Sequence, residues 1–236
     1  MMPDWSVRSR EPEWMDGEAV GWEDFDACLV DLAAVNRLTL AYRPTLDWLD
    51  RVAGARSSDR PLHILDVGSG HGDMLRVVAR WAARRQIPVR LTGIDRNPWS
   101  EASARAATPP GLPIAYVTCD LFDYRPERPP DIVLSSLFTH HLTDAEIVRF
   151  LVWMQENAAV GWFVNDLRRS PLSFHGFRLL SAAARWHRFV RHDGPVSISR
   201  AFVEADWRHL LALAGPDFAS ASIRRYFPFR LCVSSP

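Results

Sequence analysis

The stretch LDVGSGHGD, residues 65–73, decides the fold because it joins an apolar run to a turn that is rich in glycine. The run LHILDV (62–67) predicts a buried strand, and a helical pattern begins near Asp73. A strand-to-helix turn exposes backbone N–H groups to a ligand at the carboxyl end of a sheet. Asp66 adds a negative charge just before the turn. The glycines that form the turn are Gly68, Gly70 and Gly72.

The same alternation of strand and helix continues along the chain. Further strands are predicted at 89–94, 114–119, 131–136 and 159–165. Helices are predicted at about 73–86, 99–106 and 143–157, the last with a capping box. Most of the strand segments are nearly continuous apolar runs, as in strands that are buried on both faces. The pattern predicts a doubly wound, mostly parallel α/β sheet, which makes the fold Rossmann-like.

Both ends of the chain depart from this rhythm. A charged arm and two helices within 25–53 precede the first strand, so we assign residues 1–58 to an arm with cap helices. Residues 59–236 form the core, with a helical cap insertion at about 168–214 that we read as two helices joined by a Gly-Pro turn. The first of these helices is expected from about 173 to 190. The closing segments SASIRRY and FRLCV predict an antiparallel hairpin at a sheet edge.

Composition limits the classes of function. The chain has 236 residues, 47% of them hydrophobic, and 28 basic residues balance 28 acidic ones, so nothing favours nucleic acid as a partner. The three cysteines lie far apart without CxxC spacing, which argues against a disulfide framework and a clustered zinc site. We find no signal peptide and no membrane-spanning run, and we expect a cytoplasmic protein without integral membrane association.

The acids around the glycine turn select the ligand. Asp73 stands where a dinucleotide fingerprint has its last glycine, so a phosphate would be repelled and a cationic ligand attracted. Asp95 ends the second predicted strand, where a carboxylate can accept both ribose hydroxyls. Asp120 can accept from an adenine amino group, and the N–H of Leu121 can reach a ring nitrogen. These features describe an adenosine that carries a positive charge. Asp95 equally suits an NAD(P)-dependent oxidoreductase, which stays as an alternative.

Four motifs in order carry a family resemblance: LDVGSGHGD, GIDRNP, TCDLFD and DIVLSSLFTHHL. Together they cover roughly residues 62–167 and resemble the class I S-adenosylmethionine-dependent methyltransferases. The HHL in the last motif is similar to that of small-molecule members that methylate quinones and aromatic rings. The resemblance implies S-adenosyl-L-methionine as the cofactor and a seven-stranded sheet.

The resemblance also implies which positions hold the cofactor. Asp66 and the glycine turn would line its methionine and ribose, and the residues after the fourth strand would lie beneath the sulfonium. Arg43 could pair with the methionine carboxylate, or it could be an ordinary exposed arginine. The full set of expected cofactor-binding residues is Arg43, Asp66, Gly68, Ser69, Gly70, Gly72, Asp95, Arg96, Asp120, Leu121, Ser136 and Leu137.

Two histidines follow the fourth strand and are the candidates for catalysis. His141 is the first candidate for a base that takes the proton of an acceptor hydroxyl, and His140 is the second. Alternatively, the histidines hydrogen-bond the backbone at a helix entrance, and the enzyme acts by alignment alone. Methyl transfer from a sulfonium requires no metal, so no metal ligands are expected.

The stretch after the fourth strand also bears on the acceptor. Nucleic-acid amino-methyltransferases that share this fold carry a D-P-P-Y or N-P-P-Y tetrad there, whereas this chain has SSLF. We therefore expect a small-molecule acceptor of secondary metabolism, namely a hydroxylated aromatic, quinone-like or polyketide-like compound. Methylation on oxygen is favoured over methylation on carbon. A non-catalytic binding module with the same fold is a further alternative, and the sequence assigns no oligomeric state.

Overall fold

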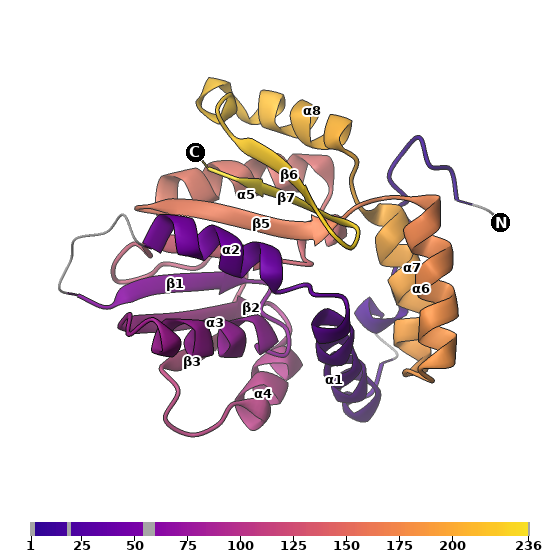
Figure 1. Cartoon of the computed structure of the whole chain (residues 1–236), viewed down its shortest axis with the longest axis horizontal. Helices are drawn as coiled ribbons and strands as arrows, with labels where there is room; N and C mark the ends of the chain where they lie inside the picture. The colour runs from indigo at the N-terminus through magenta and orange to yellow at the C-terminus, as the bar shows by residue number, and fades with distance from the viewer. Residues whose placement is uncertain (1–2, 18–19, 54–59, 236) are drawn as a thin grey trace.

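A seven-stranded sheet with the order β3-β2-β1-β4-β5-β7-β6 runs through the molecule (Figure 1). The computed structural model describes residues 3–17, 20–53 and 60–235. β1 to β5 are parallel, and β7 is antiparallel to both β5 and β6. The predicted doubly wound sheet with an antiparallel hairpin at its edge is therefore confirmed. The strands are β1 (Leu62–Val67), β2 (Val89–Asp95), β3 (Ile114–Thr118), β4 (Ile132–Ser136), β5 (Gly161–Leu167), β6 (Ser222–Tyr226) and β7 (Arg230–Ser234).

Helices cover both faces of the sheet, and others stand beyond its carboxyl end. α2, α3 and α4 pack on one face, and α5 and α8 pack on the other. None of the helices within the described ranges has the length and apolarity that crossing a bilayer requires. The helices are α1 (Trp22–Leu38), α2 (Arg43–Val52), α3 (Asp73–Arg84), α4 (Pro98–Ala107), α5 (Asp144–Asn157), α6 (Pro171–Ala183), α7 (Arg188–Arg200) and α8 (Glu204–Ala214).

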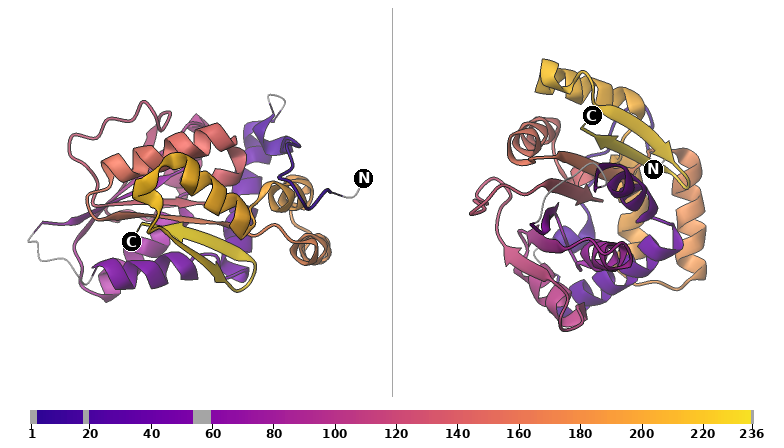
Figure 2. Two further views of the ribbon diagram at one scale, coloured as in Figure 1. Left: turned by 90° about the horizontal axis from the view of Figure 1, so that it is seen from above. Right: turned by 60° about the vertical axis from the view of Figure 1, so that its left-hand side comes forward.

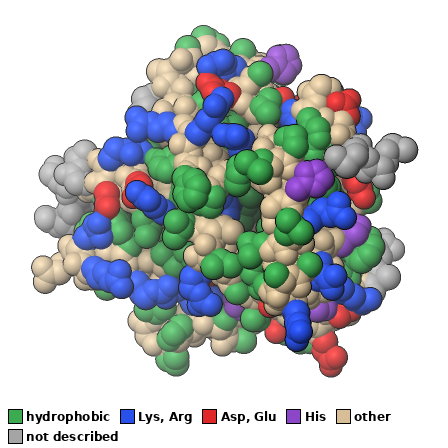
Figure 3. Space-filling model, turned by 45° about the vertical axis from the view of Figure 1, so that its right-hand side comes forward, with side chains coloured by type: hydrophobic (Ala, Val, Ile, Leu, Met, Phe, Trp, Pro, Cys, Tyr) green, Lys and Arg blue, Asp and Glu red, His purple; other side chains and the backbone are tan. Residues whose placement is uncertain are grey.

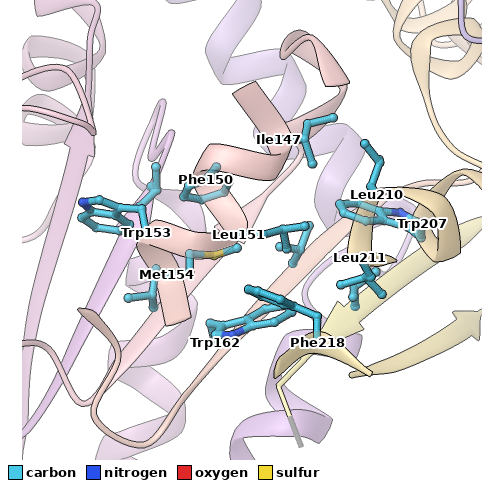
Figure 4. Packing of buried hydrophobic residues seen from close by; sticks show 14 of the residues in the cluster. Ile147, Phe150, Leu151, Trp153, Met154, Trp162, Trp207, Leu210, Leu211 and Phe218 are labelled. Atoms are coloured by element: carbon cyan, nitrogen blue, oxygen red, sulfur yellow. The ribbon is translucent and has the colours of Figure 1, made fainter. Parts of the chain in front are cut away.

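Large aromatic side chains fill the core between β5, α5 and α8 (Figure 4). Trp207 of α8 and Phe150 of α5 are completely buried, and Trp162 of β5 is almost completely buried. α5 begins at a capping box in which the Thr143 hydroxyl and the Glu146 carboxylate exchange hydrogen bonds with backbone N–H groups, as the sequence predicts. This packing fixes the loop between β4 and α5, which carries the two candidate histidines.

The cap consists of α1, α6, α7 and residues 3–17, and it stands at the carboxyl ends of the parallel strands (Figures 1 and 2). The Asp193 carboxylate on α7 accepts from the backbone N–H groups of Trp14 and Met15 at 2.8 and 3.0 Å. Arg8 donates to the carbonyl of Leu142 at 3.0 Å and to the Asp144 carboxylate at 2.6 Å. The arm expected from the sequence is thus fastened to α7 and to the β4–α5 loop.

The cap helices differ from their predicted boundaries. The helix expected over 173–190 ends at Ala183, because the backbone turns left-handed at Arg185 (φ 54°) before α7 begins. The Gly-Pro pair expected to join two helices instead lies inside α7. A Cβ on Gly194 would stand 2.0 Å from the Phe177 ring, so the missing side chain lets α6 and α7 approach closely. The insertion expected at about 168–214 therefore holds three helices, α6 to α8, instead of two.

Two helical glycines test this packing with the same substitution. Gly194→Ala should lower the free energy of unfolding by about 1–3 kcal/mol, because the added methyl group meets Phe177. Gly176→Ala on α6 meets open space and should raise it by about 0.5–1 kcal/mol through helix propensity. Urea unfolding of the two variants measures both effects. Equal shifts for the two variants would contradict a close approach of α6 and α7 at Gly194.

Candidate active site

A cavity of about 1030 Å³ lies between the carboxyl ends of the strands and the cap. The glycine turn and the loops after β2, β3 and β4 form its floor, and α1, α7 and residues 13–17 form its walls. In open α/β sheets this end of the strands is where ligands bind. The apolar side chains that α1, α6 and α7 contribute to the lining are Phe25, Cys28, Leu29, Leu32, Ala33, Val35, Phe177, Val190 and Ile198.

The glycine turn has the conformation that the sequence predicts. Gly68, Gly70 and Gly72 all have positive φ, at 71°, 48° and 70°. A Cβ on Gly68 would stand 2.6 Å from Phe138, and one on Gly72 would stand 2.2 Å from the Tyr116 hydroxyl. A Cβ on Gly70 would meet no atom nearer than Leu29, at 3.9 Å, so there is free space beside the backbone at this position. The backbone N–H groups of residues 68, 69, 70 and 72 all donate within the protein, so the turn borders the cavity without the free N–H donors that the sequence led us to expect there.

The acids predicted to bind the ligand lie around this turn. Asp95 accepts from the backbone N–H of Gly70 and of Asn97, both at 2.9 Å, and burial raises its pKa. Asp66 lines the cavity, and its Oδ1 atom has no hydrogen-bond partner in the described ranges. Burial, followed by the charges of Asp73 and Asp95, raises the pKa of Asp66 well above its ordinary value. A cationic group in the cavity would offset the free-energy cost of ionising Asp66 there.

The Asp73 carboxylate already has hydrogen-bond partners within the protein. Its Oδ2 atom accepts from the Tyr42 hydroxyl at 2.7 Å and from the side-chain amide of Asn36 at 3.0 Å. These bonds tie the start of α3 to α1 and to the residue before α2. The carboxylate still lines the cavity, so its negative charge contributes to the field there.

Most of the remaining predicted positions also line the cavity. Asp120 accepts from the backbone N–H of Phe122 at 2.8 Å, which orients its carboxylate. Leu137 has a φ of 58° and donates to the Asn165 carbonyl at 2.9 Å, so the chain bends away after β4. The predicted residues that line the cavity beside Asp66, Asp95 and Asp120 are Gly68, Ser69, Gly70, Arg96, Leu121, Ser136, Leu137, His140 and His141. Gly72, also predicted to bind the cofactor, is not among the lining residues; a Cβ there would meet the Tyr116 side chain.

The two arginines near the cap differ in a way that the sequence did not indicate. Arg43 does not belong to the cavity lining; its side chain is 67% exposed, and its Nε lies 3.6 Å from Asp47. Arg230, at the start of β7, does line the cavity and is 3% exposed. Its Nη2 donates to the Thr39 hydroxyl at 3.3 Å, whereas Nη1 has no partner among the residues described. The signal in the sequence was an arginine within the otherwise apolar segment FRLCV.

The candidate histidines form a cluster with carboxylates that the sequence analysis missed. His140 is buried, and its Nδ1 lies 2.8 Å from Asp166 Oδ1. His141 is 27% exposed, and its Nδ1 lies 3.1 Å from Asp16 Oδ2. Burial opposes protonation of His141, but the carboxylates of Asp16 and Glu13 raise its pKa above the ordinary value. Neither residue is simply a backbone cap, because each imidazole has a carboxylate partner.

Comparisons with known proteins agree with this geometry. Residues 64–161 match the family described as a methyltransferase domain. Trans-aconitate 2-methyltransferase of Streptomyces avermitilis is 30% identical over 174 residues, which are 69% of this chain and 61% of that protein. The enzyme of the same name from Escherichia coli is 32% identical over 103 residues, 43% of this chain and 36% of that protein. The chain thus spans about three fifths or less of these curated relatives.

Solved structures share the fold at low identity. The plantazolicin methyltransferase BpumL in complex with SAH has a TM-score of 0.62 at 12% identity and covers 89% of this chain and 94% of its own. Human N-acetylserotonin methyltransferase in complex with SAM also has a TM-score of 0.62, at 15% identity, over 91% of this chain and 56% of its own. The ordered motifs, the sheet, the methyltransferase-domain match over residues 64–161 and the 30% identical relative together support a class I S-adenosylmethionine-dependent methyltransferase.

Proposed function

We propose that this chain transfers the methyl group of S-adenosylmethionine to an oxygen atom of a small acceptor, a hydroxylated aromatic, quinone-like or polyketide-like compound. The observation that carries the proposal is one cavity with two unlike sides. Its floor presents the glycine turn with Asp66, Asp95 and Asp120, and its cap side is mainly apolar. A cationic adenosine suits the floor, and a planar apolar acceptor suits the cap side.

S-adenosylmethionine is the cofactor that fits these residues. The unpartnered Oδ1 of Asp66 can accept from the ammonium group, and Asp95 has lone pairs left for the ribose hydroxyls after its two backbone bonds. Asp120 and the backbone of Leu121 can take the adenine edge. When bound, the cofactor supplies a methyl group on a sulfonium, which is already activated towards displacement. A pyrophosphate would instead meet the repulsion of buried acids.

The protein's part in the reaction is to align the acceptor, exclude water and assist the loss of a proton. α1, α7 and the N-terminal segment form walls of the cavity and would limit the access of water to the transferred methyl group. His140 and His141 line the cavity, and we assign the activation of the acceptor hydroxyl to their cluster, with His141 as the more accessible of the two.

The surface around the cap is consistent with a small acceptor. Arginine side chains lie among hydrophobic ones over much of this face, and several of them adjoin in a row at its lower left (Figure 3). Some arginines of the cap have acidic partners; Arg188 of α7, for example, is bonded to Asp24 of α1. Equal numbers of basic and acidic residues in the chain give no overall excess of positive charge for a polyanionic substrate.

A second candidate is an acceptor that carries a carboxylate. Buried Arg230 favours such an acceptor, because its Nη1 has no partner among the described residues. A buried guanidinium is stabilised by hydrogen bonds to an anion. The curated relatives named above are trans-aconitate 2-methyltransferases, whose name denotes an acid as acceptor. Arg230 donates to the Thr39 hydroxyl, and the charge of Asp73, beside the glycine turn, also acts on it. Because the methionine part of the cofactor is expected near that turn, its carboxylate is the other anion that Arg230 could bind.

Calorimetric titration with S-adenosylhomocysteine tests the cofactor, with NADH as the control. We expect micromolar binding of S-adenosylhomocysteine and no binding of NADH. Asp95→Ala should weaken S-adenosylhomocysteine binding by more than about 1 kcal/mol, the loss of hydrogen bonds to a charged group. Asp123→Ala, also in the cavity lining, is the matched carboxylate control and should have a smaller effect. Binding of NADH alone would overturn the assignment.

Asp66→Asn tests the buried carboxylate through stability. Because the folded state raises the pKa of Asp66, the wild-type protein loses stability as pH rises from about 4, the unfolded value, through the folded pKa. The ligand-free variant should therefore have a higher Tm than wild type at pH 8, and the difference should shrink towards pH 4. Calorimetry should also show weaker cofactor binding by the variant. A lower Tm of the variant at pH 8 would refute this account.

Arg230→Met and Arg43→Met identify the carboxylate that Arg230 meets. If it is the methionine carboxylate, S-adenosylhomocysteine should bind Arg230→Met about tenfold or more weakly and Arg43→Met as it binds wild type, because Arg43 is exposed and outside the cavity lining. Unchanged cofactor affinity in Arg230→Met would favour the acidic acceptor. Loss only in Arg43→Met would restore the sequence-based assignment. The Tm of each variant controls for folding.

A further inference from the structure

We infer that Glu13, His140 and His141 form a binding site for one divalent transition-metal ion in the wall of the cavity. One ligand atom from each of the three residues lies within 4.8 Å of the others. His140 and His141 come from η3 (Thr139–His141), and Glu13 precedes η1 (Trp14–Asp16), so the site joins the β4–α5 loop to the N-terminal segment. Neither the family resemblance nor the comparisons assign a metal here.

The distances fit a shared cation better than a direct hydrogen bond. His140 Nε2 lies 3.7 Å from Glu13 Oε1, and His141 Nε2 lies 3.9 Å from Glu13 Oε2. Both separations exceed the roughly 3.2 Å limit of a good N–H···O bond. Ligands placed about 2.0–2.2 Å from a tetrahedral ion are roughly 3.3–3.6 Å apart. Each imidazole–carboxylate pair would therefore contract by a few tenths of an ångström, and the set of three ligand atoms, which lie within 4.8 Å of one another, would close around the ion.

The outer carboxylates orient both imidazoles towards Glu13. Asp166 lies 2.8 Å from His140 Nδ1, and Asp16 lies 3.1 Å from His141 Nδ1. If each Nδ1 carries the proton and donates to its carboxylate, each Nε2 presents a lone pair, which is the atom that a metal requires. Glu13 is held as well, because the Ser197 hydroxyl donates to its Oε1 at 2.9 Å. All three ligands are therefore supported by second partners.

Charge also favours a cation at this point. The carboxylates of Glu13, Asp16 and Asp166 surround the two imidazoles. The nearby cations, Arg200 and Arg8, make contacts away from the Nε2 atoms: both donate to the His140 carbonyl, and Arg200 also donates to that of His141. Arg8 is further neutralised by Asp144. The Nε2 side of the cluster thus keeps a local excess of negative charge.

The donor set narrows the kind of ion. Two imidazoles with one carboxylate suit zinc, iron, cobalt or nickel, whereas Mg²⁺ and Ca²⁺ prefer sites made wholly of oxygen. Three protein ligands leave a coordination position open, as in catalytic metal sites. Glu13, Asp16, His140 and His141 all line the cavity, so the open position can be reached by an acceptor.

The ion would change how the acceptor is activated. As ligands, the histidines would no longer serve as bases; the cation would instead lower the pKa of an acceptor hydroxyl so that its proton leaves to solvent. The oxygen then forms the new bond to the methyl carbon, the carbon–sulfur bond breaks, and its electron pair remains on sulfur. This step rests on the proposed function, but the binding of the ion does not.

Cobalt titration of the full-length protein without an affinity tag, after treatment with a chelator, tests the site. We expect one Co²⁺ per chain with visible ligand-field absorption, and displacement by Zn²⁺. Glu13→Gln keeps the contact with Ser197 yet weakens a ligand, and His141→Ala removes one; each should lower Co²⁺ affinity at least tenfold. His209→Ala, an exposed histidine on α8, is the matched control and should bind cobalt like wild type.

Each outcome bears on the site separately from the reaction. Absence of cobalt uptake by wild type, or equal uptake by Glu13→Gln and His141→Ala, would overturn the metal site and leave the cluster as a tie that fastens the N-terminal segment. Because the titration uses neither cofactor nor acceptor, its failure leaves methyl transfer untouched. Failure of S-adenosylhomocysteine binding with normal cobalt uptake would refute the proposed function alone.

Discussion

The Asp166 carboxylate, fully buried at the end of β5, is the contact on which the active-site region depends. It accepts from the Thr139 hydroxyl at 2.5 Å, from the His140 backbone at 3.0 Å and from the Leu167 backbone at 2.7 Å, and it pairs with His140 Nδ1. Burial alone would raise the pKa of Asp166, yet His140 and Thr139 hold it well below its usual range. One ionised carboxylate therefore fixes the β4–α5 loop against the neighbouring strand and orients the histidine.

The cap depends on this anchored loop in turn. Arg200 of α7 donates to the carbonyls of His140 and His141, and Arg8 of the N-terminal segment reaches the same loop. Asp193 of α7 then holds the backbone of Trp14 and Met15. Three segments that are distant in sequence thus converge on η3. These cross-links hold the N-terminal segment and α7 against the loop that carries the two histidines, so separate parts of the chain together form the wall of the cavity.

The sequence was most informative where local pattern and function coincide. Alternating strands and helices, the left-handed glycine turn, Asp95 and Asp120 all follow from short-range rules, and the structure brings them to one cavity. The cap was harder, because Gly194 looks like a helix breaker and acts instead as a close-packing position against Phe177. Helix propensity considers one helix by itself, whereas the glycine at position 194 of α7 is explained by its contact with a second helix, α6.

The candidate site contains residues that the sequence analysis did not predict, for a related reason. Glu13 and Arg230 lie near opposite ends of the chain, and no spacing rule connects either of them to the HHL motif or to the glycine turn. Their roles arise from burial: a guanidinium and a carboxylate, each almost inaccessible, both line the same cavity. Charged groups stay buried only when something offsets their desolvation. For Glu13 the offset includes the hydrogen bond from the Ser197 hydroxyl. Nη1 of Arg230 has no partner among the described residues, which is why we expect an anionic ligand group there.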